Sequence, residues 1–305
     1  MNRPRRPAFR RLDGILLLDK PQGMSSNQAL QRVRHLYRAD KAGHTGSLDP
    51  LATGLLPICF GEATKIAGLL LGSRKAYETE CLLGSTTTTD DAEGEVVTQR
   101  PVPVLDDALI HAELARLTGR IIQVPPIYSA LKQAGVPLYK RARRGEDVIA
   151  PPREVDVDRF ELIEKADDRL RLMIECGSGT YVRSLVRDLG EQLGCGAHVT
   201  ALRRLWVDPF ANPQMSSIEE LARLAETDAG ALDQRLLPLE QGLAGYPQVR
   251  LDVAAVTRLR QGQSVETDGG LVGRCVALDG TGRAVALAEC DAHGRMRSLR
   301  GFNPA

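Results

Sequence analysis

Residues 43 to 54, Gly-His-Thr-Gly-Ser-Leu-Asp-Pro-Leu-Ala-Thr-Gly, hold three glycines, one proline, one histidine and one carboxylate. This composition favours a tight loop that presents a side chain, and Asp49 is the side chain presented. A plainer interpretation is also open, because Asp49 followed by Pro50 fits a helix N-cap with proline at the first helical position. Residues 55 to 61, Leu-Leu-Pro-Ile-Cys-Phe-Gly, favour an edge strand over a helix. We therefore predict a functional loop between two elements.

Length and composition indicate the class of protein. With 305 residues, the chain can form one large or two ordinary domains. Its 43% apolar and 26% charged residues are typical of a soluble globular protein. No window reaches the apolar length of a membrane span, and no apolar signal core follows the charged amino terminus. We expect a cytoplasmic protein without a membrane partner.

The six cysteines are scattered along the chain. They form no Cys-x-x-Cys pair and have no nearby histidine at zinc-ligand spacing. We therefore expect buried free thiols, with neither disulfides nor metal. The cysteines are Cys59, Cys81, Cys176, Cys195, Cys275 and Cys290.

Basic residues cluster at two places, although the net charge is only +1. Either cluster alone would fit an ordinary solvated surface. The second has aromatic residues close by, and the two together favour a nucleic-acid partner. The first cluster is Arg3, Arg5, Arg6, Arg10 and Arg11, and the second is Lys132, Lys140, Arg141, Arg143 and Arg144, beside Tyr128 and Tyr139.

Periodicity and turn residues predict an α+β chain. A buried strand over 14–19 leads through a turn to a helix that Ser26 or Asn27 can cap. Residues 124 to 152 are basic and punctuated by prolines, which predicts an insert that projects from the core toward a partner. Other strands are expected over 76–84, 155–163, 170–176 and 197–207, and helices over 62–71, 108–117 and 181–193.

The carboxy-terminal part has a different pattern. A connecting helical region ends near Gly245, and short strands separated by glycine or aspartate turns follow it. About sixty residues of this kind, with one helix over 254–261, predict a small β-rich second domain.

Several motifs together resemble the TruB family of pseudouridine synthases, and the resemblance covers almost the whole chain. Residues 43–50 resemble the family's catalytic motif, and residues 74–77, Arg-Lys-Ala-Tyr, its tyrosine motif. Residues 179–185, Gly-Thr-Tyr-Val-Arg-Ser-Leu, resemble its arginine motif. At one position the chain departs from the pattern, because Ser178 stands where the family has a lysine. Further similar stretches are 18–23 (the first motif), 125–132 (the RNA-clamping insert) and 196–204 (the leucine segment).

The resemblance implies a pseudouridine-synthase fold, a mixed, mostly antiparallel sheet flanked by helices, followed by a small β-barrel-like PUA domain that binds RNA. It divides the chain into a basic flexible tail over 1–11, a catalytic domain over 12–245 that contains the RNA-clamping insert 124–152, and a PUA-like domain over 246–305. We expect a monomer.

The implied activity is that of an isomerase, an intramolecular transferase that converts the T-loop uridine at tRNA position 55 to pseudouridine. The expected partner is therefore the tRNA T-arm. Moving the ribose from N1 to C5 leaves the atomic composition of the nucleoside unchanged. The reaction therefore needs no redox cofactor or metal, and none is expected. A carboxylate can attack or stabilise the electron-poor centre, and Asp49 is the candidate. The resemblance pairs it with Arg183, which would keep it ionised.

The same resemblance assigns roles to other side chains, each of which also fits an ordinary structural role on sequence alone. Tyr77 would stack on the flipped base and assist proton removal from C5, and His44 would occupy the space that the base leaves. Tyr181 and Leu202 would line the pocket. The remaining candidates are Lys20 and Pro21, which would shape the pocket wall, and Lys132, Lys140, Arg141 and Arg144, which would bind RNA from the insert.

Two other functions fit parts of the pattern. An RNA-binding chaperone without catalysis would need the basic clusters but not Asp49. A glycosidase-like hydrolase would need a second carboxyl group at a fixed distance from Asp49. Asp90 and Asp91 lie in a polar loop and have no evident reason to face Asp49, which disfavours the hydrolase.

Overall fold

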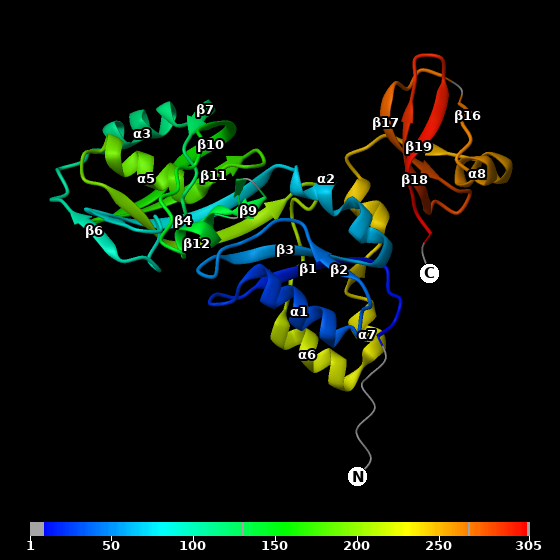
Figure 1. Ribbon diagram of the computed structural model, residues 1–305, viewed down its shortest axis with the longest axis horizontal. Helices are drawn as coiled ribbons and strands as arrows, with labels where there is room; N and C mark the ends of the chain where they lie inside the picture. Colours follow the sequence, from blue (N-terminus) through cyan, green and yellow to red (C-terminus); the bar gives the residue numbers. More distant parts are fainter. Residues whose placement is uncertain (1–8, 130, 134, 268, 304–305) are drawn as a thin grey trace, which may run out of the picture.

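A ten-stranded mixed sheet forms the centre of the larger part of the computed structural model, which describes residues 9–129, 131–133, 135–267 and 269–303 (Figure 1). The strand order is β13-β1-β3-β12-β4-β11-β10-β7, with β14 on β1 and β2 on β3. Among the described strands of this sheet, β1–β13 and β3–β12 pair in parallel and the others in antiparallel, which confirms the expected mixed, mostly antiparallel sheet. The strands are β1 Gly14–Lys20, β2 Ala42–His44, β3 Thr53–Phe60, β4 Lys75–Leu83, β7 Gly119–Gln123, β10 Arg153–Ala166, β11 Arg169–Cys176, β12 Ala197–Val207, β13 Ser216–Ser217 and β14 Leu236–Leu237.

Helices pack against this sheet. In α5 (Val182–Gln192), Val182, Leu185, Val186 and Leu189 form the buried stripe that the helical spacing predicts. The cap of α1 (Ser26–Leu36) is Ser25, one residue before the predicted candidates, because Ser25 and Gln28 form a reciprocal capping box. The other helices of this part are η1 Gly61–Ile66, α2 Ala67–Leu71, α3 Asp107–Arg116, α6 Ile218–Thr227, α7 Ala229–Asp233 and η2 Leu239–Leu243.

Strand β3 lies inside the sheet, so its interpretation as an edge strand is wrong. It pairs with β1 on one side and with β2 and β12 on the other. The Pro57 carbonyl faces the loop after β2 and accepts a hydrogen bond from Thr45 N at 3.2 Å. In a strand, the N–H and the carbonyl of one residue point to the same side, so the N–H that Pro57 lacks would also face this loop. Pro57 is therefore tolerated inside the sheet. No ladder donor on the β1 side is lost.

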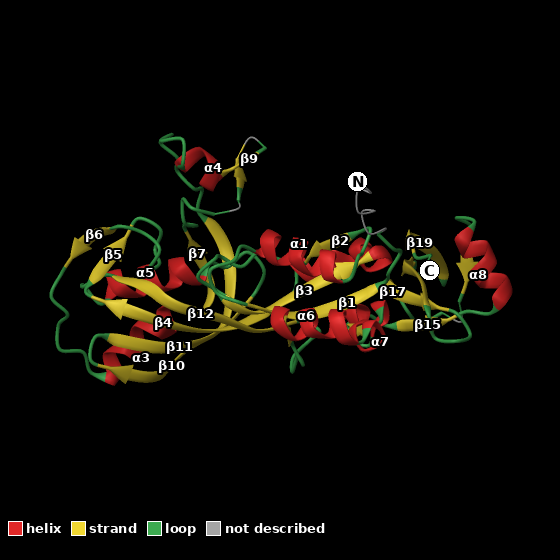
Figure 2. Cartoon of the chain, turned by 90° about the horizontal axis from the view of Figure 1, so that it is seen from below, coloured by secondary structure: helices red, strands yellow, loops and turns green. Residues whose placement is uncertain are grey.

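The segment between β7 and β10 stands away from the sheet (Figure 2). It contains β8 (Lys132–Gln133), β9 (Val136–Pro137) and α4 (Leu138–Ala142). Its own small core consists of Leu138, Val148 and Ala150, with Leu131 packed against them. A separate hairpin, β5 (Ser85–Thr87) with β6 (Val96–Gln99), follows β4.

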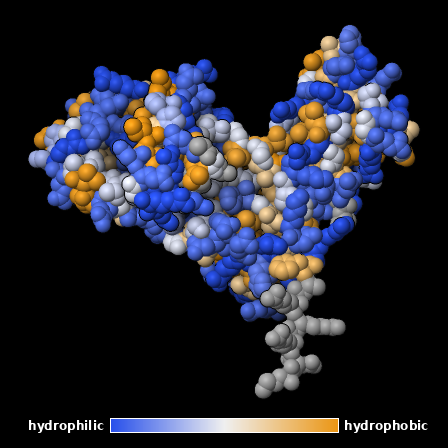
Figure 3. Space-filling view, in the orientation of Figure 1, coloured by the Kyte–Doolittle hydropathy of each residue, from blue (hydrophilic) through white to orange (hydrophobic). Residues whose placement is uncertain are grey.

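The carboxy-terminal part is a five-stranded sheet in the order β15-β17-β18-β19-β16, with α8 (Val253–Arg260) beside it. This curled sheet is consistent with the PUA-like fold. Figure 3 shows a notch between the lobe that carries it and the lobe that carries β4 and β11. The strands are β15 Gln248–Arg250, β16 Val265–Glu266, β17 Gly273–Leu278, β18 Ala284–Cys290 and β19 Arg295–Gly301.

The two sheets share one hydrophobic cluster below this notch. Strand β1 sends Leu16 and Leu18 into the main core and Ile15 and Leu17 to the opposite face. That opposite face packs in one cluster with Leu278 and Leu287 of the carboxy-terminal sheet and with Phe302, which follows β19. The two parts are therefore joined by packed apolar side chains as well as by the connecting chain.

The cysteines are buried, as predicted, and all six are free thiols. In the part of the chain that the structure describes, no helix is long and apolar enough to cross a membrane.

Candidate active site

A cavity of about 660 Å³ opens between the loop after β2 and the amino-terminal end of α5. Six of the side chains singled out in the sequence line it, although they come from four separate segments of the chain. These are His44, Asp49, Tyr77, Tyr181, Arg183 and Leu202.

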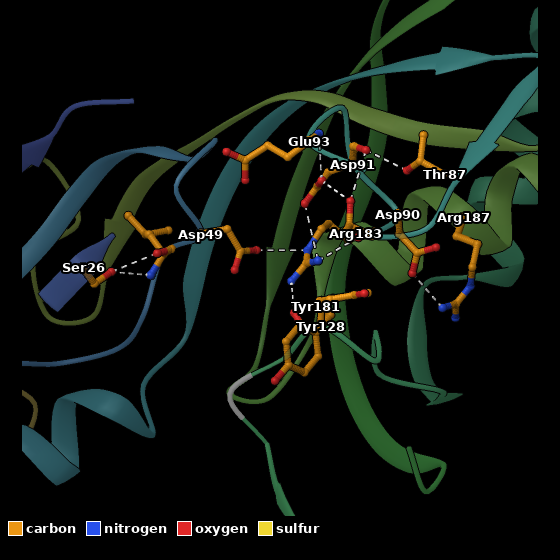
Figure 4. Close-up of polar contacts among 12 residues, drawn as sticks. Ser26, Asp49, Thr87, Asp90, Asp91, Glu93, Tyr128, Tyr181, Arg183 and Arg187 are labelled. Carbon is orange, nitrogen blue, oxygen red and sulfur yellow. Dashed lines mark hydrogen bonds and ion pairs between the residues drawn. The ribbon is translucent and has the colours of Figure 1, made fainter. Parts of the chain in front are cut away.

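The loop over 43–54 is shaped by contacts with its neighbours. The Ser26 hydroxyl accepts from Leu48 N at 2.7 Å and lies 3.0 Å from Leu48 O. At Gly54, where φ is +94°, a Cβ would lie 2.2 Å from the Arg204 carbonyl oxygen, so only glycine fits. Asp49 caps no helix, because its carbonyl closes a single turn to Ala52 N before β3 begins. Its side chain is free to point at Arg183 (Figure 4).

Arg183 lies on the first turn of α5 and is only 4% exposed. Its Nε atom is 3.0 Å from Asp49 Oδ2 and its Nη1 atom is 3.4 Å from Asp91 Oδ2. The guanidinium also donates to the carbonyls of Thr89 at 2.7 Å and Tyr128 at 2.9 Å. Figure 4 shows Asp49, Asp91 and Tyr128 around the guanidinium. A guanidinium held by four groups presents Asp49 with a fixed cation.

Asp91 shares Arg183 with Asp49, which corrects the expectation that it has no reason to face that site. A β-bridge between Asp91 and Val199 of β12 brings the polar loop back against the sheet. The buried carboxylate also accepts from Thr89 Oγ1 at 2.5 Å and from Glu93 N at 3.1 Å. Asp90 turns away and pairs with Arg187 at 3.0 Å.

The charges around Asp49 oppose one another. Desolvation raises the pKa of the Asp49 carboxyl above its ordinary value, and the charge of Asp91 adds to this, while Arg183 and Lys20 act in the opposite direction. The Asp49 side chain remains 40% exposed to the open cavity. It is therefore both accessible and poorly solvated, which suits a carboxylate that reacts.

Two further cations, Lys75 and Arg204, line the cavity, and neither was predicted as a site residue. Arg204, 1% exposed, donates from Nε to Leu55 O at 2.7 Å. Lys75 is also buried, and desolvation followed by the charge of Arg204 lowers its pKa to about 8. Burial raises the pKa of Tyr77, and Arg204 beside it works against that shift.

The surroundings of His44 favour the neutral form of its imidazole ring. Desolvation and then the charge of Arg204 lower its pKa. Its Nδ1 atom accepts from Gly46 N at 3.4 Å, which leaves the proton on Nε2.

Lys20 and Pro21 do not line the cavity, so the structure does not support their predicted place in its wall. Lys20 is fully buried, and its ammonium donates to the carbonyls of Pro21 at 2.8 Å and Met24, which holds the turn after β1. Desolvation lowers its pKa to about 8, while the charge of Asp49 acts against this.

The basic residues of the insert lie outside the cavity. Lys140 is exposed on α4, whereas Arg141 pairs with Glu146 at 2.6 Å and Arg144 lies 3.9 Å from the same carboxylate. The Lys132 side chain lies outside the described residues, as do Arg3, Arg5 and Arg6 of the first cluster. In the described ranges, no group of three or more His, Cys, Asp or Glu residues could hold a metal ion.

The chain belongs to the TruB family of pseudouridylate synthases. The family model described as "TruB family pseudouridylate synthase (N terminal domain)" matches residues 34–182, and "tRNA pseudouridylate synthase B C-terminal domain" matches residues 183–244. Similar curated proteins carry the name tRNA pseudouridine synthase B. That of Xanthomonas campestris pv. campestris (strain B100) is 57% identical over 98% of this chain and 96% of its own length. That of Xylella fastidiosa (strain Temecula1) is 57% identical over 98% of both.

Solved structures share the fold. A chain in a Cbf5-Nop10-Gar1 complex superposes with a TM-score of 0.74 over 95% of this chain and 84% of its own, at 22% identity. One in an H/ACA RNP bound to a substrate RNA containing 2'-deoxyuridine gives 0.75 over 95% and 85%, at 21% identity. At this identity, the likeness concerns the fold alone.

Proposed function

We propose that this protein converts the T-loop uridine at tRNA position 55 to pseudouridine. The observation that carries the proposal is Asp49, accessible at the cavity and held 3.0 Å from a buried arginine. Family membership supplies the reaction class, and the names of the relatives supply the RNA class. The position within the tRNA rests on the resemblance of the catalytic, tyrosine and arginine motifs.

The reaction breaks the bond between N1 and the ribose C1′ and forms a bond between C5 and C1′. The proton on C5 leaves, and N1 gains one, so atoms balance without a second substrate. Ionised Asp49 would attack or stabilise the electron-poor centre when the first bond breaks, and Arg183 would hold its carboxylate in place. Tyr77 would stack on the base and take part in removing the C5 proton.

The base must leave the folded RNA to reach Asp49. A cavity of about 660 Å³ has room for a nucleotide. Tyr181 and Leu202 would contact the base there, and neutral His44 would fill the space that it vacates. Unpairing costs a few kcal/mol, which contacts with the rest of the RNA would offset.

The parts of the chain would divide this work. We assign catalysis to residues 12–245, RNA clamping to the insert 124–152, and additional RNA binding to the PUA-like residues 246–305. Support comes from the insert's position, which stands away from the sheet with Lys140 exposed (Figure 2).

The proposal is tested by incubating the purified chain with unmodified tRNA transcript, with no metal or nucleotide added. Pseudouridine is then mapped by carbodiimide-dependent primer extension. A single new stop at the T-loop uridine is the expected result. A stop elsewhere would contradict the position, and tight binding without any stop would favour the chaperone.

The acid side of the pH profile should depend on Asp91. The negative charge of Asp91 helps to raise the pKa of Asp49, and catalysis requires Asp49 ionised, so activity should rise as pH rises through that pKa. Asp91→Asn removes the charge and should shift this limb to lower pH in kcat/KM measurements. Asp90→Asn, whose carboxylate pairs with Arg187, is the control and should leave the limb in place.

Neutralising two basic residues of the insert should weaken tRNA binding. The double variant Lys140→Gln, Arg144→Gln removes two cations that can contact phosphates, so the slope of log K against log salt should fall by about two. The control is Arg116→Gln with Lys165→Gln, an equal charge change on α3 and β10. Equal slopes for both double variants would exclude the insert as the clamp.

A further inference from the structure

Arg153 lies at the rim of the cavity and has no role in the proposed chemistry. It begins β10, pairs there with Gln123 of β7, and lines the cavity with Tyr181. Its guanidinium carbon lies 4.9 Å from the centre of the Tyr181 ring. A Cβ at Gly179 would lie 3.5 Å from the same carbon, so the turn before α5 passes close over the guanidinium. The side chain is thus held between a ring and a turn.

The platform beneath Arg153 is itself fixed. Gln123 is fully buried, and its amide donates to Tyr181 O at 3.1 Å and accepts from Tyr181 N at 2.8 Å. The Gln123 side chain therefore satisfies both backbone polar groups of Tyr181. Arg153 therefore lies against two residues that hold each other in place, Gln123 and Tyr181, which are 58 positions apart in the chain.

Two donors of Arg153 are unused. Its Nε and Nη2 atoms are buried, and neither has a hydrogen-bond partner among the described residues. A buried donor without a partner costs free energy. Arg183 Nε also lacks a well-aligned hydrogen bond, but it lies 3.0 Å from the Asp49 carboxylate. Arg187 pairs with a carboxylate and Arg204 donates to carbonyls, so these neighbouring arginines have partners within the protein. In the described part of the chain, these two donors of Arg153 therefore await an acceptor.

The shape and charge of the site define that acceptor. Nε–H and one Nη2–H point along the same edge of a guanidinium, the fork that matches two oxygens of a phosphate. The carboxylate that lines the cavity is Asp49, and Asp91, which does not line it, shares the cation Arg183. A phosphate that approaches ionised Asp49 would meet repulsion, which the charge of Arg153 would offset together with those of Arg204 and Lys75.

We propose that Arg153 binds a phosphate of the substrate RNA, at a linkage that flanks the uridine entering the cavity. This inference rests on the proposed function, because that function brings a nucleotide to the cavity. Arg153 thereby fixes the strand on one side of Tyr181 while the base lies on the cavity side.

The test measures binding of T-arm hairpins that carry one neutral methylphosphonate at successive linkages around the target uridine. All proteins carry Asp49→Asn, so that no turnover occurs during the measurement. With Arg153 present, a neutral methylphosphonate should weaken binding by about tenfold at one particular linkage and much less at the others. With Arg153→Met, which keeps an unbranched side chain over Tyr181, the same linkage should cause no further loss. The salt slope should also fall by about one.

Two further variants separate charge from packing. Arg153→Lys keeps the charge without the fork and should retain the salt slope while losing part of the affinity. Arg120→Met, which removes an exposed arginine on β7 paired with Asp156, should leave the linkage map unchanged.

The proposal is overturned if no linkage stands out when Arg153 is present. It is also overturned if Arg153→Met weakens binding of every hairpin equally and leaves the map intact, since Arg153 would then only support Tyr181. Conversion of the unmodified hairpin by the wild-type chain is assayed in parallel. Absence of pseudouridine there would contradict the proposed function, whereas pseudouridine with a flat linkage map would contradict the phosphate contact alone.

Discussion

Asp49→Asn is expected to lower turnover of the T-loop uridine by at least about 10⁴-fold, the scale seen when an enzyme loses a residue that it uses chemically. The amide keeps the size of the side chain but cannot attack a carbon centre or stabilise positive charge as a carboxylate does. Binding of tRNA should be little changed, because the base still finds its cavity. Single-turnover conversion and a binding isotherm measure the two effects separately.

The same variant should fold at least as well as the wild type. Since burial raises the pKa of Asp49 in the folded chain, its ionised form opposes folding at pH 7.5, and the amide removes that opposition. Arg183 retains Asp91 as a partner. The matched control is Asp233→Asn on α7. It breaks an exposed ion pair between Asp233 and Arg10 and should keep full activity. Wild-type turnover by Asp49→Asn would remove Asp49 from the mechanism.

Arg183→Met is expected to reduce kcat by about 10²- to 10³-fold at pH 7.5. Without the guanidinium, Asp49 faces Asp91 with no arginine between them, so the pKa of Asp49 should rise further and less of it should be ionised. Activity should therefore recover in part as pH is raised. A pH series of single-turnover rates measures this.

Stability should fall in the same variant. Asp91 and two backbone carbonyls would lose a buried donor, and breaking a buried pair costs about 3 kcal/mol. Adding Asp91→Asn should restore part of that stability, because it removes the unpaired buried charge. Arg187→Met, one turn further along α5, controls for loss of an arginine from this helix. An unchanged pH profile for Arg183→Met would show that Arg183 does not govern the ionisation of Asp49.

Site residues that lie within continuous motifs could be predicted from the sequence. Asp49 lies among glycines whose backbone demands are local, and Tyr77 and Arg183 lie in short stretches that resemble family motifs. The structure brings all three to one cavity, and their catalytic roles stay predictions. Most strands and helices were likewise predicted within a few residues, because a period of two or 3.6 is a local property.

The remaining site residues depend on contacts between distant segments. Asp91 reaches Arg183 only because its loop bridges to β12, and a polar loop in the sequence carries no sign of that bridge. Gln123 and Arg153 come together as paired ends of β7 and β10. The position of β3 inside the sheet depended in the same way on which strands it pairs with, while Pro57 suggested an edge.

Through the hydrophobic cluster that the two sheets share, the carboxy-terminal sheet helps to cover the face of β1 that points away from the main core. Removing residues 246–305 would take Val276, Leu278, Leu287 and Phe302 out of the cluster that holds Ile15 and Leu17 of β1, and would leave apolar side chains of that cluster open to water. Such a truncated chain would be prone to aggregate, and its lost activity would say little about RNA binding. The carboxy-terminal sheet is therefore no detachable module, because its inner face is a structural partner of the larger part as well as a part of the RNA-binding domain that we propose.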